Sequence, residues 1–549
     1  MQRSALAKRV WLLFFLAAPV LYLYGLGRLP LLGPDEPRYA QIAREMLERG
    51  DPITPTLGGK AWFEKPALLY WMIAAAFGAF GVSEWAARLG PALCGLLTGL
   101  LVYMIGRRVE LKSDEDTDAG GLGLWSAAAL LSSAGMIVFS RGASFDVVVT
   151  CTLTAALACF FIAELTVGER ARRWWLAGFY AAIGASLIAK GLIGIILPAG
   201  IVAACFLLRR EWPARGIVLS LLWGAPLTLL VAASWYGPVT ARHGWTFVDQ
   251  FIIQHHFARY LSNKYHHPQP FYFYLPVAAL FSLPWTAFLV AALVGARRWE
   301  WRSRAPASRL RVYAFAWLVV PIAFFSLSGS KLPGYILPAL PGAALLVGER
   351  LRFYTRDAAS GTGWMRATGV GLLSLAISIA VYLTYFGQVA SSRAIMVALP
   401  LFLVGLFVTA RARLRSPGAA LVIIATFAAT VLAINLVLEQ GARGESVRDL
   451  IAQASERGYA SAPVFELHTV ERTAEFYAAG RVVRGADNDI IKFEGVPEIA
   501  EEMRRRGGGP ALVIVPLEFV RLLTGYAPLE MEVIGDNGQV ALVAVRLRI

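Results

Sequence analysis

The chain has 549 residues, of which 57% are hydrophobic and only 16% are charged. A soluble domain carries about 25% charged residues, so this composition excludes an ordinary soluble enzyme and indicates a membrane protein. The formal net charge is +15. We interpret most of this excess as basic residues in cytoplasmic loops and the remainder as cations that meet anionic lipid or phosphate. Nucleic acid is not expected as a partner, because the arginines flank apolar segments instead of gathering on one soluble face.

The N-terminal segment has the features of a signal anchor. Three basic residues, Arg3, Lys8 and Arg9, precede an apolar run from Trp11 to Gly27, and no A-x-A cleavage pattern follows. We therefore expect an uncleaved anchor with its N-terminus in the cytoplasm. The four cysteines lie within apolar stretches and lack the spacing of a metal site, so they predict neither a zinc centre nor a disulfide framework.

Apolar segments long enough to cross a bilayer recur along the chain, and we count about thirteen of them. The expected fold class is therefore mainly α, a polytopic membrane helix bundle. The segments are 9–27, 86–107, 122–139, 146–167, 173–189, 191–208, 216–236, 270–294, 311–328, 335–349, 367–387, 393–410 and 418–438.

One further apolar stretch, 66–81, decides the orientation of the chain. If it crossed the membrane, the arginine clusters of the later loops would all face outward. The positive-inside rule predicts that these clusters face the cytoplasm, so we expect 66–81 to be an interfacial or re-entrant helix on the outer side. The periplasmic segments are then 28–65, 139–146, 237–269, 328–335 and everything after about residue 439.

The tail has a different composition from the rest of the chain, because it is charged and alternates helical with strand patterns. We divide the chain into a transmembrane domain, 1–439, that includes periplasmic loops 28–85 and 237–269, and a small periplasmic α/β domain, 440–549. The tail elements that we expect are helices at 446–457 and 497–506, strands at 464–467 and 511–515, and a hairpin over 533–547 that turns at 536–538.

The first outer loop holds acids and a lysine next to the membrane. Asp35 and Glu36 lie between two prolines, before a helix predicted over 37–49. They could simply stabilise the start of that helix, but an unpaired charge beside a membrane is costly and indicates function. Lys65 begins the interfacial helix. It is either a surface lysine that extends to water or a ligand for a phosphate at the boundary.

Other outer segments contribute further charged groups. Arg141 and Asp146 bracket a very short turn, where they could pair with each other, and Lys190 lies between two apolar spans with almost no loop. Lys331 and Tyr335 are donors in a Gly- and Pro-containing loop, which membrane depth permits only in a protein-lined cavity. We expect this loop to form a second wall of the same site.

Loop 237–269 contains five of the six histidines. His255 or His256 together with Glu64 could form a divalent-metal site, although the spacing is not specific for one. The alternative is that these groups and Arg259 bind phosphate or line a headgroup pocket. No cofactor is expected beyond this candidate metal ion.

Two motifs resemble those of a known superfamily. The runs Asp35-Glu36-Pro37-Arg38-Tyr39-Ala40 and Phe63-Glu64-Lys65-Pro66 resemble the first periplasmic loop of the GT-C glycosyltransferases. Within that superfamily they are most similar to the bacterial lipid A aminoarabinose transferases and the related protein mannosyltransferases. The run Lys331-Leu332-Pro333-Gly334-Tyr335-Ile336-Leu337-Pro338 resembles a late-loop motif of the aminoarabinose transferases. The resemblance covers most of residues 1–350 in layout.

The resemblance implies a multi-pass protein of the Gram-negative inner membrane with a periplasmic active site. It implies an inverting transfer of 4-amino-4-deoxy-L-arabinose from undecaprenyl phosphate to a lipid A phosphate, and thereby resistance to cationic peptides. The catalytic candidates are Asp35, Glu36 and Asp146. The substrate- and phosphate-binding candidates are Arg38, Tyr39, Lys65, Arg141, Lys190, Arg259, Lys331 and Tyr335. The open alternatives are a protein or glycan glycosyltransferase that uses a polyprenyl-phosphate sugar, a lipid flippase, and a sensor with a partner-binding tail.

Overall fold

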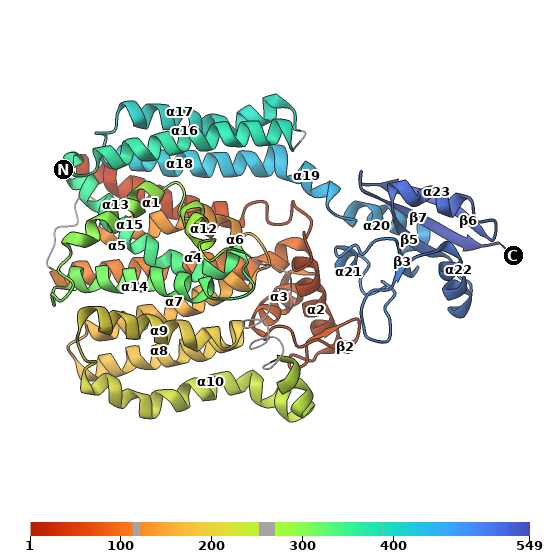
Figure 1. Cartoon of the computed structure of the whole chain (residues 1–549), viewed down its shortest axis with the longest axis horizontal. Coiled ribbons are helices and arrows are strands. Elements are labelled where there is room, and N and C mark those ends of the chain that lie inside the picture. Colours follow the sequence, from red (N-terminus) through yellow and green to blue (C-terminus); the bar gives the residue numbers. More distant parts are fainter. Residues whose placement is uncertain (1, 114–120, 252–268, 388, 549) are drawn as a thin grey trace. The chain divides into compact units, whose positions relative to one another are not determined.

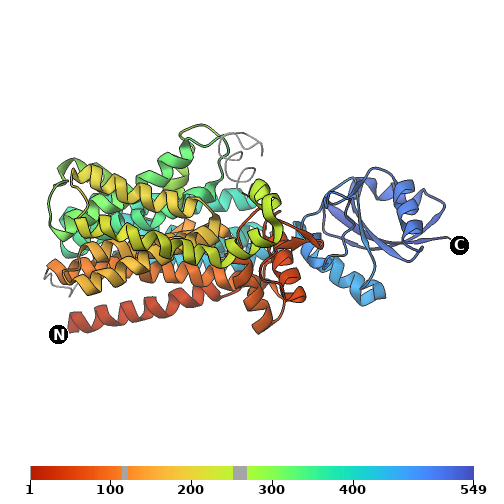
Figure 2. The ribbon, with the colours of Figure 1, turned by 90° about the horizontal axis from the view of Figure 1, so that it is seen from below.

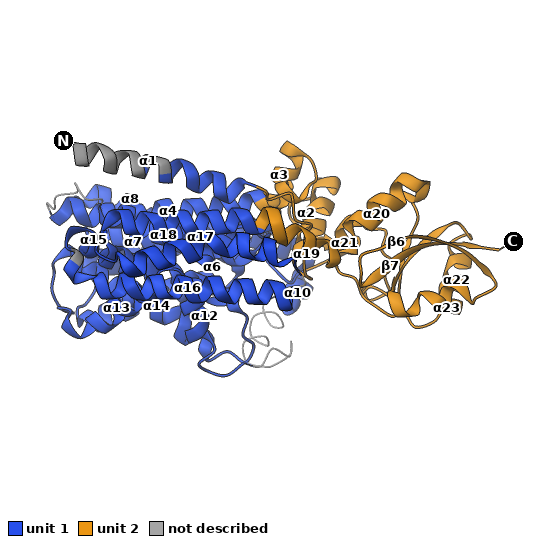
Figure 3. Ribbon diagram, turned by 90° about the horizontal axis from the view of Figure 1, so that it is seen from above, with its two compact units in different colours: residues 1–24, 63–69, 89–433 blue, residues 25–62, 70–88, 434–549 orange. Residues whose placement is uncertain are grey.

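The computed structural model describes residues 2–113, 121–251, 269–387 and 389–548. The chain divides into two compact units, which Figure 3 colours separately. Unit 1 comprises Met1–Tyr24, Phe63–Leu69 and Leu89–Ala433. Unit 2 comprises Gly25–Trp62, Tyr70–Arg88 and Ile434–Ile549. Most of the segment 28–65, the expected first outer loop, therefore folds with the tail in one unit. The predicted boundary at residues 439 and 440 had grouped this segment with the membrane helices.

Unit 1 is a bundle of apolar helices, and Figures 1 and 2 show its long members side by side from two directions. Its helices are α1 (Gln2–Leu23), most of α4 (Glu84–Ser113), α5 (Leu122–Leu131), α6 (Ala134–Ser140), α7 (Phe145–Glu164), α8 (Glu169–Lys190), α9 (Ile193–Arg209), α10 (Arg215–Phe247), α12 (Tyr274–Phe281), α13 (Thr286–Gly295), α14 (Pro306–Ser326), α15 (Leu340–Arg356), α16 (Thr362–Tyr385), α17 (Ser391–Ala410) and α18 (Ser416–Ala433).

Within the described ranges, seven helices are long and apolar enough to cross a membrane, and two bent helix pairs raise the number to nine. The expected count of about thirteen spans is therefore not confirmed, although the mainly helical membrane architecture is. Some of the expected spans are shorter apolar helices, among them α9 with 17 residues. Others bend sharply, because α5 and α6 meet at 60° and α12 and α13 meet at 118°.

Two helix boundaries differ from the predicted ones. The expected span 335–349 begins as a 3-10 helix, Pro333–Ala339, and the regular helix α15 starts only at Leu340. Prolines at 333 and 338 lack the backbone N–H that an α-helix needs, which explains the irregular start. The expected loop 237–269 begins as helix, because α10 continues to Phe247 and changes direction at Gly244, whose φ is 55°.

Unit 2 begins with Gly25–Trp62, most of which was expected to be the first outer loop. Helix α2 (Glu36–Arg49) confirms the predicted 37–49 helix and stops at Gly50, whose positive φ of 60° favours glycine. A two-stranded ribbon, β1 (Thr56–Leu57) and β2 (Lys60–Ala61), follows it. Helix α3 (Leu68–Phe80) has 13 residues, so it is too short to span a bilayer, as predicted for 66–81.

The tail folds into a five-stranded sheet of order β4-β3-β5-β7-β6. The predicted strands are confirmed as β3 (Val464–Leu467) and β5 (Ala511–Pro516), which pair in parallel, and the predicted hairpin is confirmed as β6 (Leu529–Asp536) with β7 (Val540–Leu547). The remaining elements are α19 (Glu439–Gly444), α20 (Arg448–Ala454), α21 (Ala474–Tyr477), β4 (Lys492–Phe493), α22 (Val496–Arg505) and α23 (Val520–Thr524). Two apolar clusters form the core of this sheet domain.

Candidate functional site

Three of the predicted residues of unit 1, Asp146, Lys190 and Tyr335, form one cluster. Asp146 lies in the first turn of α7, where the Ser144 hydroxyl accepts a hydrogen bond from the Asp146 backbone N–H at 3.1 Å. Lys190, the last residue of α8, forms an ion pair with Asp146. The Lys190 ammonium also lies 4.9 Å from the centroid of the Tyr335 ring. A cation, a carboxylate and an aromatic donor from three distant segments thus converge.

Glycine at position 334 is a sterically required part of this cluster. A Cβ atom at Gly334 would lie 2.3 Å from Oδ2 of Asp146, which no real side chain tolerates. The 3-10 helix that carries Gly334 and Tyr335 therefore packs directly against the Asp146 carboxylate. The close approach of Gly334 to Asp146 is a tertiary feature that the sequence pattern did not predict.

Lys331 is a buried cation with no acidic partner in the described part of the chain. Only 7% of the residue is exposed, and its ammonium donates to the backbone carbonyl of Ser328 at 2.7 Å. The neighbouring Ser330 is 1% exposed, and its hydroxyl has no hydrogen-bond partner among the described residues. A buried positive charge beside an unsatisfied hydroxyl is costly unless an anion completes the site.

Two other predicted cations of unit 1, Lys65 and Arg141, are held by nearby groups. Lys65 pairs with Glu64, with 2.7 Å between Nζ and Oε1. Arg141 donates to the backbone carbonyls of Leu21 at 2.5 Å and Tyr24 at 2.7 Å. Within the described residues Asp146 pairs with Lys190, and the predicted alternative of an Arg141–Asp146 pair does not form.

The motif at residues 35–40 lies in unit 2, and its members have different surroundings. The Asp35 side chain is exposed and does not cap α2, and it has no ion pair within the described residues. Arg38 lies with its guanidinium 5.5 Å from the centroid of Trp62. Tyr39 is only 5% exposed and packs against Tyr70 with the ring centroids 6.1 Å apart. Asp35 is thus accessible, whereas Tyr39 belongs to the core of this unit.

Glu36 is engaged by Arg88, a residue that the sequence reasoning did not single out. Arg88 is 3% exposed and binds both carboxylate oxygens of Glu36, at 3.0 and 2.7 Å. It also donates to the carbonyls of Leu26, Leu29 and Pro30 at 2.7 Å each. This bidentate pair fixes the chain before α2 and leaves Glu36 poorly placed to accept a proton. An arginine within an otherwise apolar segment was the available signal.

Arg38 also takes part in a buried ionic cluster that the tail contributes. The Glu475 side chain of α21 is fully buried and lies 3.8 Å from Arg38 Nε. Arg472 and Arg484 approach the same carboxylate at 3.2 and 3.3 Å. The cluster ties the start of α2 to the sheet domain inside unit 2. The tail contained no motif that indicated this role.

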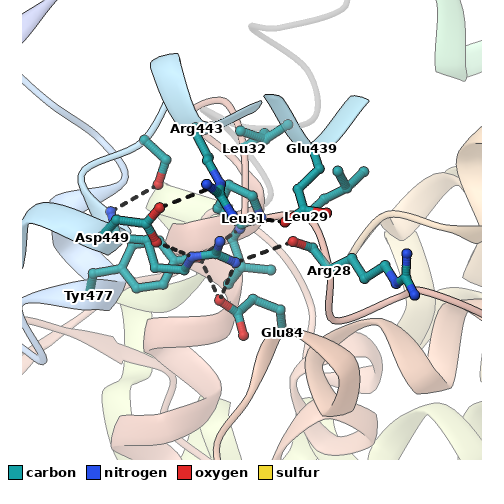
Figure 4. A network of polar contacts seen from close by, with 12 residues as sticks. Arg28, Leu29, Leu31, Leu32, Glu84, Glu439, Arg443, Asp449 and Tyr477 are labelled. Atoms are coloured by element: carbon teal, nitrogen blue, oxygen red, sulfur yellow. Dashed lines mark hydrogen bonds and ion pairs between the residues drawn. The ribbon is translucent and has the colours of Figure 1, made fainter. Parts of the chain in front are cut away.

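A second polar network in unit 2 surrounds Glu84 (Figure 4). The Tyr477 hydroxyl donates to Glu84 at 3.1 Å and accepts from the Leu31 backbone N–H at 2.8 Å. Arg448 approaches the same carboxylate at 3.5 Å. Burial and the neighbouring carboxylate both raise the pKa of Tyr477, so its hydroxyl stays protonated and serves as a structural donor. The network anchors the segment that leads into Asp35.

Three of the predicted site residues, Arg259, His255 and His256, lie outside the described residues. Glu64, the third candidate metal ligand, pairs with Lys65. Among the described residues, no three His, Cys, Asp or Glu side chains are grouped closely enough to hold a metal ion. The metal hypothesis therefore stays a prediction.

Several known proteins are similar to this chain in sequence. The chain is 35% identical over 379 residues to the undecaprenyl phosphate-alpha-4-amino-4-deoxy-L-arabinose arabinosyl transferase of Pseudomonas aeruginosa, which covers 67% of this chain and 65% of that protein. It is 32% identical over 401 residues to the protein of the same name from Erwinia tasmaniensis, covering 71% of this chain and 66% of that protein. The chain thus matches slightly less than two thirds of the length of these relatives.

The fold has a solved counterpart. The crystal structure of ArnT from Cupriavidus metallidurans bound to undecaprenyl phosphate matches with a TM-score of 0.76 and 24% identity, covering 97% of each chain. This likeness confirms the predicted GT-C architecture of a multi-pass membrane bundle with a small C-terminal domain. The family model described as dolichyl-phosphate-mannose-protein mannosyltransferase matches residues 10–299, more than half of the sequence. The chain is therefore a multi-pass membrane member of the dolichyl-phosphate-mannose-protein mannosyltransferase family, with the aminoarabinose transferases among its relatives.

Proposed function

We propose that this chain transfers 4-amino-4-deoxy-L-arabinose from undecaprenyl phosphate to a phosphate of lipid A. The observation that carries the proposal is the 35% identity, over 67% of the chain, to a transferase named for that donor. The site chemistry supports it, because an enzyme with a lipid-phosphate leaving group needs fixed cations where charge develops. We further propose that the site faces the periplasm from the inner membrane of a Gram-negative bacterium, on the basis of the positive-inside pattern.

In this proposal, Lys331 is the main cation for the departing phosphate. Its ammonium is buried and bonded to the carbonyl of Ser328, and the hydroxyl of Ser330 offers an unused donor beside it. Lys190 and Tyr335 would add donors from the neighbouring cluster. Asp146 would hold Lys190 in place as a positioning residue. Lys65, Arg141 and Arg259 stay candidate phosphate ligands on their sequence positions.

Asp35 would act on the acceptor or on the sugar. The acceptor phosphate has a second pKa of about 6 and is therefore largely deprotonated at neutral pH, so it needs little help from a base. The exposed carboxylate of Asp35 could orient the acceptor or meet the ammonium of the sugar. Because Glu36 is bound by Arg88, we assign it to positioning this loop instead of proton transfer. The anomeric carbon gains oxocarbenium character as the phosphate departs, and one-step displacement inverts it.

The matched family model favours one second candidate, the glycosylation of a protein hydroxyl. A hydroxyl acceptor has to lose a proton in the reaction, so Asp35 would then be a general base. The two candidates differ in the role of this one residue. With a phosphate acceptor, Asp35→Asn retains part of its activity at all pH values. With a hydroxyl acceptor, it loses nearly all activity.

The test is mass spectrometry of lipid A from cells with and without this chain. An added pentosamine on lipid A supports the proposal, and unchanged lipid A together with a glycosylated protein favours the second candidate. The chain with Lys331→Ala should give little or no modified lipid A, whereas the exposed Lys112→Ala serves as the matched control. Wild-type modification by Lys331→Ala at equal expression would contradict its assignment to phosphate binding.

A further inference from the structure

A cavity of about 370 Å³ lies between α13, α15 and the start of α16, in unit 1. It is separate from the cluster around Asp146, because no residue that lines it belongs to that cluster. Its polar wall contains Arg350 and Arg356, and its apolar wall contains Phe288, Phe353 and Trp364. The volume is within the range of small-ligand sites, roughly 300–1,000 Å³. Two guanidinium groups and three aromatic rings around one cavity are suited to a ligand that is anionic at one end and apolar at the other.

Arg350 forms no ion pair with an acid in the described part of the chain, although Glu349 attracts it at longer range. The adjacent carboxylate, Glu349, is taken by Arg311, whose Nε donates to its two oxygens at 2.8 and 3.0 Å. The Nε atom of Arg350 is buried and has no hydrogen-bond partner among the described residues. Asp357 also lines the cavity, but its Oδ1 accepts from the Ala359 backbone N–H at 3.0 Å. The cavity therefore has a guanidinium with an unfilled donor, Arg350 Nε, and one acid in its wall, Asp357.

Two further features favour an anion in this cavity. Helix α16 begins there without a side-chain cap, because its N-cap residue is Gly361, and the N-terminus of a 24-residue helix attracts negative charge. On α13, a Cβ atom at Gly295 would lie 1.8 Å from Nη2 of Arg350. Because glycine has no side chain, the Arg350 guanidinium can lie directly against α13 at this position.

The aromatic wall indicates the source of the anion. Phe353 is 40% exposed on the surface of the bundle. An aromatic ring at this position would be costly in water, so its exposure favours contact with lipid. Tryptophan and arginine near helix ends are typical of the membrane–water boundary. Basic residues also gather in the neighbouring segment that follows α13, at 297, 298, 302 and 304, and such segments attract anionic lipid.

We propose that this cavity binds the phosphate of an anionic phospholipid, with Arg350, Arg356 and the start of α16 around the phosphate and the rings of Phe288, Phe353 and Trp364 along the first part of the acyl chains. The proposal does not depend on the sugar or the acceptor of the transfer reaction. It assigns a lipid site at the end of the bundle that carries these basic segments, in addition to the site for the lipid-linked donor.

The experiment measures lipid binding to the purified full chain in a neutral detergent. Short-chain phosphatidylglycerol, short-chain phosphatidylcholine and inorganic phosphate are titrated separately, and the apparent Kd is followed by native mass spectrometry and by the shift in Tm. We expect phosphatidylglycerol to bind at least tenfold more tightly than the other two. Equal binding of phosphatidylcholine would overturn the anionic requirement, and equal binding of inorganic phosphate would overturn the lipid assignment.

Substitutions locate the binding within the cavity. Arg350→Ala and Arg356→Ala should each weaken phosphatidylglycerol binding at least tenfold, and Arg350→Lys should recover only part of it because it lacks the planar fork. The exposed Arg366 lies on α16 outside the cavity, so Arg366→Ala is the matched control and should bind like the wild type. Because Arg356 is exposed, its variant should fold even if Arg350→Ala does not. Wild-type affinity in Arg356→Ala and Arg350→Lys together would overturn the proposal.

Discussion

Two buried charge sites, one in each unit, have different partners. In unit 2, Glu36 is bound by Arg88 and Glu475 is surrounded by three arginines, so the carboxylates are neutralised by fixed partners. In unit 1, Lys331 is buried with only a backbone carbonyl as acceptor. Since breaking a buried pair costs stability and an unpaired buried charge is costly by itself, the comparison distinguishes residues that hold the fold from those that we propose bind a ligand.

The largest expected effect is on stability, from breaking the buried pair of unit 2. Arg88→Ala removes the guanidinium that binds the Glu36 carboxylate and three backbone carbonyls, and we expect it to lower the free energy of unfolding by about 3–5 kcal/mol. Thermal unfolding of the purified chain measures this loss. The surface pair of Arg173 and Glu169 provides the control, because Arg173→Ala should cost less than about 1 kcal/mol. Similar losses in both variants would erase the distinction between buried and exposed pairs.

The next effect is a pH dependence from Glu466, a buried residue of β3. Burial raises its pKa from 4.5 to about 8, with Glu471 and Glu475 adding to the shift. Between these values the folded chain keeps the proton that the unfolded chain has lost, so stability falls as pH rises, by about 1.4 kcal/mol per pH unit. Unfolding measured at about pH 5.5 and about pH 7.5 should differ by about 3 kcal/mol more in the wild type than in Glu466→Gln. An identical pH dependence in the two proteins would contradict the shift.

Substitution of Lys331 should lower the transfer activity and leave stability unchanged, whereas substitution of Arg88 should lower stability. Lys331→Met keeps the volume and removes the charge, so we expect unchanged or higher Tm and about a hundredfold lower transfer. Ser330→Ala should lower transfer less, by about tenfold, because it removes one neutral donor. Activity is measured in membranes with the lipid-linked sugar. A strong loss of Tm in Lys331→Met would place this lysine among the structural residues and break the comparison.

The smallest stability effect is expected at Asp35, which is exposed and does not cap α2. Asp35→Asn should change the free energy of unfolding by less than about 0.5 kcal/mol. Its transfer rate should nevertheless fall, and the exposed Asp489→Asn provides the control for both measurements. Wild-type transfer by Asp35→Asn would remove its catalytic role and leave the unit 1 cations as the core of the site.

Local patterns predicted much of the fold. The strand at 464–467, the hairpin through 536–538 and the helices α2 and α3 appear where the residue patterns indicated them, because apolar periodicity and turn residues act over a few neighbours. The irregular start of α15 and the sharp bend between α12 and α13 did not follow from hydropathy. A hydropathy window averages over about 20 residues and does not detect a break within them.

The sequence by itself determined the class of the protein and the chemical character of its site, since long apolar blocks require a bilayer and cations with carboxylates suit lipid-phosphate chemistry. Only the tertiary structure decided which charges are paired. Arg88 is 52 residues from Glu36, Lys190 is 44 from Asp146, and Glu475 joins a loop more than 400 residues earlier. An ion pair depends on distance in space, and separation along the chain does not set that distance, so the assignment of structural and ligand-binding charges required the fold.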